Sequence, residues 1–267
     1  MSVSIVTPVY NGQRFLKDLY ANISSLLSDT VEWIIVNDCS TDDTLSILND
    51  LSKERFVKVV NLEKNSGPGI ARNEGAQHSD KNYIFLLDVD DVIYKNNFDD
   101  FIKFCDKNPR FDFYYAPLKL INSKSEVDSA ARKLNFEGLK VKKVKNPIMY
   151  ISNGFPQPSS LVIKRDFYLK NDIRNRLSWG EDFMLYLILA KYGEGIKWNN
   201  LVSFYYVDGY GRGSKLSLRK RMILSRDLLK ISVKKGKVIS SLFYTIYLTL
   251  RHILSYFYKL IFKRNKG

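Results

Sequence analysis

Short apolar runs alternate with helix-spaced apolar residues along the first 120 residues of the chain. Runs that predict buried strands cover residues 3–7, 33–36, 57–62 and 83–87. Apolar residues recur at helical spacing over residues 15–27 and 45–51, and a third helix is expected to open at residues 67–69 and run towards residue 77. These repeated strand–helix units predict an α/β fold, with a mainly parallel central sheet and helices on both faces.

The regular alternation stops after residue 122. Residues 123–146 are polar and rich in lysine, and we interpret them as an insertion or mobile segment. Regular patterns return with a strand at 159–163, a helix from about residue 180 to 192, and a strand at 201–207. We therefore expect a domain over residues 1–210, with halves 1–120 and 121–210, and a separate segment at 211–267.

Unusual polar and glycine residues follow each of the first four strands. In chain order they are Tyr10 and Asn11, then Asp38, then residues 65–72, and finally Asp88, Asp90 and Asp91. The carboxyl ends of parallel strands share one edge of a sheet, and open α/β sheets bind ligands in the crevice there. We therefore expect these residues to converge on one site. A capping box, residues 40–43 (STDD), is expected at the start of the second helix.

The three carboxylates after the fourth strand indicate a metal. Like charges so close raise one another's pKa unless a cation lies among them. Oxygen donors favour Mg²⁺ or Mn²⁺ over zinc, and an ion held by few protein oxygens usually takes phosphate oxygens as well. A turn and helix cap would explain one acid but fits three poorly.

The net charge of the 267-residue chain is +14, and all of the excess lies near its end. Residues 211–267 contain 15 basic residues and one acidic residue, whereas the first 210 contain 27 of each. Within that basic segment, residues 238–250 are uncharged but too short for the roughly 20 residues that span a bilayer. A polar stripe along residues 238–262 predicts an interfacial helix on an anionic membrane surface. The alternative is a helix packed on the protein or in an oligomer, and no recognition motif indicates nucleic acid.

Cysteine and histidine usage excludes several classes of site. The chain has two cysteines, Cys39 and Cys105, and two isolated histidines, so we expect neither a zinc site nor a disulfide framework. The amino terminus lacks the basic and apolar pattern of a secretory signal. We therefore expect a cytoplasmic chain, peripheral at the cytoplasmic face of the membrane.

Four motifs, in their order and spacing, resemble those of family 2 glycosyltransferases with the GT-A fold. They are SIVTPVYN at 4–11, IVNDCSTD at 35–42, NSGPGIARN at 65–73 and FLLDVDD at 85–91, followed later by WGED at 179–182. The resemblance implies a Rossmann-like layered fold. It also implies an inverting, metal-dependent transfer of a sugar from a nucleotide-sugar such as a UDP-sugar. The acceptor would be a hydroxyl of a saccharide or lipid-linked saccharide, as in bacterial polysaccharide or lipopolysaccharide synthesis.

The resemblance further assigns residues to the donor site. Asp38 would accept the uracil N–H, with Pro8 and Tyr10 beside the base. Asn37 and Cys39 depart from the Asp and Gly that the family often has around this carboxylate. Arg72 follows a Gly-Pro-Gly turn and would face phosphate, although a solvated helix arginine is the competing interpretation.

Metal binding and loop closure complete the donor site that the resemblance implies. In the DxD motif, Asp88 would contact ribose or metal-bound water, Asp90 would coordinate Mn²⁺ or Mg²⁺, and Asp91 would support the metal or the loop. Arg212 and Lys215 lie in a glycine-rich basic loop that would close on the diphosphate, unless it is a surface linker.

Glu181 and Asp182 resemble the family's ED motif. Asp182 would be the catalytic base that takes the acceptor's proton, with Glu181 beside it in the acceptor pocket. Acids also favour a helix amino end through its dipole, which is compatible with catalysis. Trp179 would offer a stacking face for sugar or belong to the core.

Three other functions compete with this interpretation. Residues 88–92 also satisfy the nucleophile motif of haloacid-dehalogenase-like phosphatases, but that motif normally follows the first strand. A sugar nucleotidyltransferase would have a glycine-rich amino-terminal loop, which is absent. A non-catalytic scaffold for glycan or membrane is disfavoured because Asp38, Asp90 and Asp182 are all present.

Overall fold

The computed structural model describes residues 1–127, 142–144, 157–171 and 181–206. All of them belong to the first of two units into which the chain divides, Met1–Asp208. The domain boundary predicted at residue 210 and the basic segment 211–267 lie outside the described residues.

The central sheet has eight strands, in the order β3-β2-β1-β4-β9-β6-β10-β8. Its first part is parallel and consists of β3 (Val57–Asn61), β2 (Val31–Asn37), β1 (Val3–Val9) and β4 (Tyr83–Leu86). Its second part is mixed. Strand β9 (Leu161–Lys164) runs antiparallel to both β4 and β6 (Phe113–Tyr115), while β10 (Gly195–Lys197) runs parallel to β6. The predicted α/β fold with a largely parallel central sheet is confirmed.

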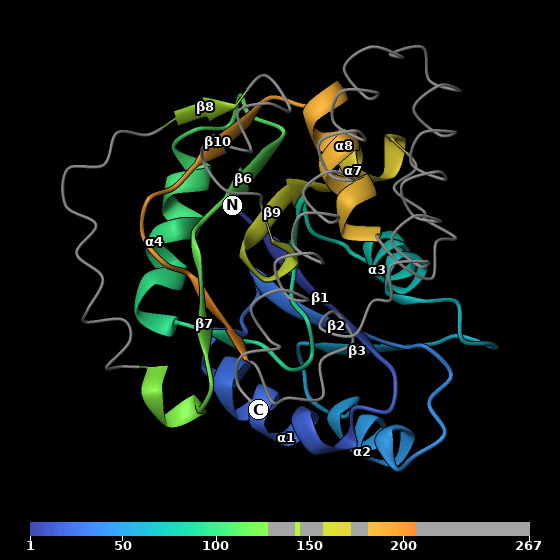
Figure 1. Cartoon of the computed structure of the whole chain (residues 1–267). Helices are drawn as coiled ribbons and strands as arrows, with labels where there is room; N and C mark the ends of the chain where they lie inside the picture. Colours follow the sequence, from blue (N-terminus) through green and yellow to red (C-terminus); the bar gives the residue numbers. More distant parts are fainter. Residues whose placement is uncertain (128–141, 145–156, 172–180, 207–267) are drawn as a thin grey trace, which may run out of the picture. The chain divides into compact units, whose positions relative to one another are not determined.

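Helices cover both faces of this sheet (Figure 1). One apolar cluster joins it to α1 (Gln13–Ile23), α2 (Thr44–Leu51) and α4 (Lys95–Asp106). The other joins the opposite face to α3 (Pro68–Gln77), α7 (Arg165–Lys170) and α8 (Glu181–Tyr192). The described part of the chain also contains the short 3₁₀ helices η1 (Ser24–Leu26), η2 (Lys124–Glu126) and η3 (Pro158–Ser160).

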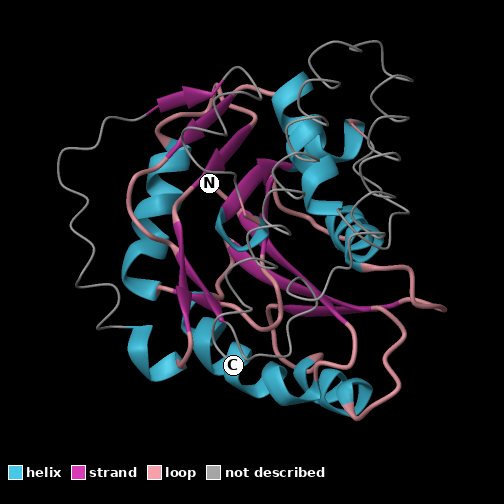
Figure 2. Cartoon of the chain, viewed as in Figure 1, coloured by secondary structure: helices cyan, strands magenta, loops and turns pink. Residues whose placement is uncertain are grey.

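A second, three-stranded sheet contains β5 (Val92–Ile93), β11 (Ser203–Tyr206) and β7 (Leu118–Ile121). Figure 2 colours the strands of both sheets magenta and the helices cyan. Strand β11 lies between the other two, antiparallel to β5 and parallel to β7. It therefore brings residues from the late part of the described chain to the segment that follows β4.

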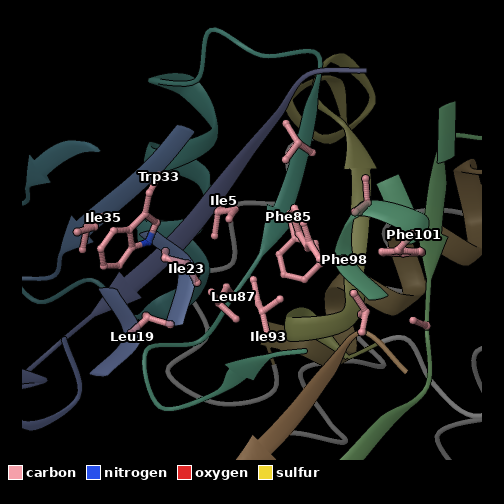
Figure 3. Packing of buried hydrophobic residues seen from close by; sticks show 14 of the residues in the cluster. Ile5, Leu19, Ile23, Trp33, Ile35, Phe85, Leu87, Ile93, Phe98 and Phe101 are labelled. Atoms are coloured by element: carbon pink, nitrogen blue, oxygen red, sulfur yellow. The ribbon is translucent and has the colours of Figure 1, made fainter. Parts of the chain in front are cut away.

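The first apolar cluster fixes α1 and α4 on the sheet (Figure 3). Trp33 is fully buried and its indole N–H donates to the Thr7 hydroxyl at 2.9 Å. Phe85 of β4 meets Phe98 of α4 edge to face, with ring centroids 5.7 Å apart. Full burial of such a side chain stabilises the fold by about 2–3 kcal/mol. The carboxyl end of β4 is thus anchored in the core.

Tight packing and one glycine turn set the position of α3. Gly67 precedes the helix at φ 89°, a conformation that glycine adopts without steric cost. A Cβ on Gly75 would lie 2.5 Å from Val6 Cγ1, so the helix approaches β1 too closely for any side chain. The predicted helix from Gly67 is confirmed, and its first turns point residue 72 towards the strand ends.

Two local predictions differ from the structure. In the segment 123–146, which we interpret as an insertion or mobile segment, residues Lys142–Val144 form β8 and pair antiparallel with β10 at the sheet edge. The expected capping box is also wrong. Asp43 is the N-cap of α2 without a side-chain hydrogen bond, and it is Asp42 Oδ1 that accepts the Thr44 N–H at 3.0 Å.

Among the described residues, none of the helices combines the length and the apolar character that crossing a bilayer requires.

Candidate active site

The predicted convergence of strand ends is confirmed by the register of the central sheet. Strands β1, β2, β3 and β4 are parallel neighbours, so the residues that follow them share one edge. Pro8 is buried within β1, and Tyr10 is half-buried just beyond its end. Tyr10, Asp38 and the acidic turn after β4 therefore lie along one edge of the sheet, at the carboxyl ends of its parallel strands.

Asp38 is almost fully buried and holds the loop that leads into α3. Its Oδ1 accepts the Ser66 N–H at 2.7 Å, and its Oδ2 accepts the Gly67 N–H at 2.8 Å. A carboxylate oxygen has two lone pairs, so each one retains acceptor capacity beyond its backbone bond. Asp38 thus shapes the loop and is compatible with accepting a further N–H.

The segment that follows β1 is hydrogen-bonded to the segment that follows β2, which begins with Asp38. Asn11 adopts φ 51°, a conformation that asparagine tolerates, and its Oδ1 accepts the Thr41 N–H at 2.8 Å. The Gly12 N–H donates to Thr44 Oγ1 at 2.9 Å, and the Asp43 N–H donates to the Gln13 side chain at 2.8 Å. The loop after β1 therefore keeps a fixed position against the loop after β2.

Asn37 and Cys39, the two departures from the family pattern, differ in local structure: Asn37 makes two side-chain hydrogen bonds, and Cys39 has an unusual backbone angle. Asn37 donates through Nδ2 to Asn61 Oδ1 at 3.0 Å, and its Oδ1 accepts the Ser40 N–H at 3.1 Å. Aspartate could not supply that donor. Cys39 lies at φ 59°, in the left-handed region that favours glycine.

Arg72 connects three parts of the site. Its side chain is 5% exposed, its Nη2 donates to Asp88 Oδ1 at 2.6 Å, and its Nη1 donates to Asp182 Oδ1 at 3.0 Å. The buried Tyr168 lies close by. Burial raises the pKa of its hydroxyl, an effect opposed by Arg72 and reinforced by Asp182. The arginine expected to face phosphate is held here by two carboxylates.

The acidic turn after β4 is partly buried. The Asp91 N–H donates to the Asp88 carbonyl at 3.2 Å, which closes the turn. Burial raises the pKa of the Asp91 carboxyl well above its usual range, and the charges of Asp88 and Asp90 raise it further. The Ser159 hydroxyl and the Tyr206 N–H, at 3.3 Å, act in the opposite direction. The carboxylates thus repel one another, as the sequence predicts.

The acidic turn does not by itself form a complete set of metal ligands. Among the described residues, no three or more Asp, Glu, His or Cys side chains are arranged to hold a metal ion. Asp91 is buried, Asp88 is engaged by Arg72, and Asp90 is half-buried. Carboxylates at this density suit an ion that takes its other ligands from a diphosphate and water, as Mg²⁺ commonly does.

Several predicted site residues are not described. Helix α8 begins at Glu181, whose side chain lies outside the described part of the structure. Trp179, Arg212 and Lys215 lie outside the described residues.

Sequence reasoning missed residues that approach the acidic turn from the later half of the domain. Ser159 Oγ accepts the Asp88 N–H at 3.0 Å, and its hydroxyl is the group that lowers the pKa of the Asp91 carboxyl. Tyr205 is half-buried on β11, and its hydroxyl pKa is raised by burial and then by the surrounding site carboxylates. A serine before a strand and a tyrosine within one carry no local signal of such contacts.

Comparisons with known proteins identify relatives of this chain. Residues 4–167 match the description of glycosyl transferase family 2. A putative teichuronic acid biosynthesis glycosyltransferase, TuaG, from Bacillus subtilis is 36% identical over 103 residues, which cover 38% of this chain and 41% of the relative. The poly(ribitol-phosphate) beta-N-acetylglucosaminyltransferase TarS of Staphylococcus aureus is 32% identical over 111 residues, which cover 40% of this chain and 19% of TarS. The matched part is thus less than half the length of these relatives.

The fold also resembles that of solved structures. The crystal structure of S. aureus TarS 1–349 in complex with UDP-GlcNAc matches with a TM-score of 0.64 at 21% identity, covering 86% of this chain and 67% of that one. The crystal structure of S. aureus TarS 1–349 matches with a TM-score of 0.61, also at 21% identity. At this level of identity the likeness concerns the fold alone.

Proposed function

This chain belongs to glycosyl transferase family 2, and we propose that it transfers a sugar from a UDP-sugar to a hydroxyl of a saccharide or lipid-linked saccharide. Relatives named for teichuronic acid biosynthesis, for poly(ribitol-phosphate) and for poly-beta-1,6-N-acetyl-D-glucosamine support a role in bacterial surface polymers. The TarS complex with UDP-GlcNAc supports a UDP-linked donor.

The observation that carries the proposal is the pair of bonds from Arg72 to Asp88 and Asp182. One guanidinium brings the first acid of the DxD turn and the acid at the start of α8 into one hydrogen-bonded unit. A transferase needs this proximity, because the base must act on an acceptor oxygen that attacks the sugar held beside the diphosphate.

In the proposed reaction Asp182 is the base. Its side chain is 40% exposed, so an acceptor hydroxyl can reach it, and a carboxylate oxygen takes the proton as that hydroxyl attacks the anomeric carbon. A single displacement of this kind inverts the anomeric configuration. Glu181 is proposed to bind the acceptor next to Asp182.

The UDP-sugar donor is proposed to lie along the edge of the sheet that the carboxyl ends of the parallel strands form. Asp38 accepts the base N–H, Pro8 and Tyr10 flank the base, and Asp88 contacts the ribose or metal-bound water. Mn²⁺ or Mg²⁺, held by Asp90 with Asp88, would supply the positive charge that stabilises the departing diphosphate.

The cationic residues complete the proposed donor site. Arg72 offers a guanidinium next to the turn that carries Asp88, and Asp91 supports that turn. From the sequence, Arg212 and Lys215 are proposed to close over the diphosphate.

We also propose a peripheral location at the cytoplasmic membrane face, because residues 211–267 combine 15 basic residues with an amphipathic pattern. This part of the proposal rests on sequence alone.

A donor screen tests the proposed activity. The full chain is incubated with a panel of UDP-, GDP- and dTDP-sugars in Mn²⁺ or in chelator, and nucleotide release is measured with and without saccharide acceptors. Metal-dependent release of UDP from one donor, increased by an acceptor, is the expected result. Release of inorganic phosphate from sugar phosphates would instead indicate a phosphatase, and the absence of any turnover together with glycan binding would indicate a scaffold.

A further inference from the structure

The turn that carries Asp88 and Asp90 is held by a residue from the later half of the domain. Ser159 lies in η3, directly before β9, and is 1% exposed. Its Oγ accepts the Asp88 N–H at 3.0 Å, and its hydroxyl lies near enough to the Asp91 carboxyl to lower the pKa of that group. One buried hydroxyl thus binds the backbone of the first acid of the turn and influences the last.

A hydroxyl group has one donor and two acceptor positions, so Ser159 can bind the Asp88 N–H and still present its own O–H to a neighbouring carboxyl. Alanine at this position would remove the acceptor of the Asp88 N–H and the influence of this hydroxyl on the buried Asp91 carboxyl. The turn would then lose a hydrogen bond that fixes its first residue.

The second sheet supports Ser159 in turn. The Ser203 hydroxyl of β11 donates to the Ser159 carbonyl, and Ser203 is fully buried. Three residues further along β11, the Tyr206 N–H donates to Asp91 Oδ1 at 3.3 Å. Strand β11 therefore contacts the acidic turn directly and through Ser159.

We propose that Ser159 is a positioning residue for the nucleoside diphosphate and its divalent cation. Its hydroxyl fixes the backbone of the Asp88–Asp91 turn, so that Asp88 and Asp90 keep the orientation that a diphosphate-bound cation requires. The inference rests on the proposed function, because it concerns binding at that same site. Ser159 acts through the acidic turn and is not itself a catalytic residue.

The neighbouring Ser160 provides a matched control. It is also fully buried and lies in the same η3 turn, but its hydroxyl donates to the Gln157 carbonyl at 3.1 Å. Replacing either serine by alanine removes one buried hydroxyl from the same segment. Only Ser159→Ala removes a hydrogen bond to the acidic turn, so the difference between the variants isolates positioning from stability.

The experiment uses the full chain and both alanine variants. The dissociation constant of UDP in Mn²⁺ is measured by calorimetry, the unfolding midpoint by heating, and the exchange rate of the Asp88 amide by NMR. For Ser159→Ala we expect UDP affinity to fall at least about tenfold, or about 1.4 kcal/mol, and the Asp88 amide to exchange faster. For Ser160→Ala we expect a similar change in midpoint, UDP affinity within about twofold of wild type, and an unchanged Asp88 amide.

Two results would overturn the inference while leaving the proposed function intact. One is an unchanged UDP affinity in Ser159→Ala despite faster exchange of the Asp88 amide, since the contact would then not position the ligand. The other is an equal loss of affinity in both variants, since the effect would then follow stability. Failure of the wild-type chain to bind any nucleoside diphosphate would instead refute the proposed function, and the inference with it.

Discussion

Arg72 and Asp182 lie 110 positions apart in the sequence, yet a hydrogen bond of 3.0 Å joins them. The same buried guanidinium donates to Asp88 at 2.6 Å. Without this cation two partly buried carboxylates would face one another, and the start of α8 would lose its connection to the end of β4. The proximity of donor-side and acceptor-side acids therefore depends on one side chain.

Replacing Arg72 should affect stability and activity together. Removal of one partner from a buried ion pair costs about 3–5 kcal/mol, and a smaller loss of about 1–3 kcal/mol is expected because Asp88 and Asp182 are partly exposed. Turnover of Arg72→Met should fall at least about 100-fold. Arg72→Lys should recover little, because an ammonium group lacks the planar fork that reaches two carboxylates. Urea unfolding and single-donor kinetics measure both effects.

Lys58 provides a control for that experiment. It also bridges two carboxylates, Glu32 at 3.0 Å and Asp80, but it lies on β3 outside the group of residues that follow the strand ends. Lys58→Met should lose stability while keeping its turnover per folded molecule. A similar loss of turnover in both variants would mean that the effect of Arg72 is only structural.

Asp182→Asn should separate catalysis from donor binding. The amide oxygen can still accept the Arg72 N–H, so the geometry of the site should persist, but the amide cannot take a proton at neutral pH. Turnover should fall about 100-fold or more with nearly unchanged UDP affinity. Normal turnover at saturating donor, combined with weaker UDP binding, would assign Asp182 to the donor site instead.

Asp90→Asn tests the proposed metal ligand. We expect UDP to bind the wild-type chain in Mn²⁺ or Mg²⁺ but not in chelator, because the carboxylates of the turn repel a diphosphate unless a cation lies between them. The variant should lose this metal-dependent binding, which calorimetry measures directly. Equal UDP affinity in metal and in chelator would rule out the metal assignment.

The order of elements and the shared edge were predictable because both follow from local patterns. Six strands, four of the helices and the convergence of Tyr10, Asp38 and the acidic turn came from apolar periodicity and parallel topology. Helix α4 was missed even though Phe98, Phe101 and Cys105 form its buried face. Asparagine and aspartate, both poor helix formers, fill several of its other positions and weaken the pattern.

The contacts that complete the site were not predictable in the same way. The antiparallel pairing of β4 with β9, the bond from Asp88 to Ser159 and the pairing of Arg72 with Asp182 all join distant segments. Local periodicity contains no information about such partners. The sequence therefore indicates which acids belong to the site but not what holds them in position.

Cys39 should be a site of stored backbone strain. It adopts φ 59°, which costs a residue with a Cβ about 1–2 kcal/mol relative to glycine. Cys39→Gly relieves this strain, but glycine also gains conformational entropy in the unfolded chain, which offsets part of the gain, so the free energy of unfolding should rise by up to about 1 kcal/mol. Urea unfolding of the variant measures this difference. A clear loss of stability would show that the contact from Cys39 Sγ to the Glu63 carbonyl outweighs the strain.

The basic segment can be tested without knowledge of the sugar. If residues 238–262 form an interfacial helix, the full chain should co-sediment with anionic vesicles, less in high salt and hardly with neutral lipid. A chain that ends before Val238 should stay in the supernatant and still bind UDP. Vesicle binding that survives the deletion would exclude this helix as the anchor, and a deletion that prevents folding would favour a packed helix.

Under the proposed function, the interlocked loops after β1 and β2 limit how donor preference can be engineered. Asn11 and Gln13 on one loop bind the backbone of Thr41 and Asp43 on the other, so the two segments form one mechanical unit. A graft that imports only the first loop from a relative would leave backbone N–H groups of the second without their acceptors. We therefore expect that nucleotide preference can be exchanged between relatives only if both loops are replaced together.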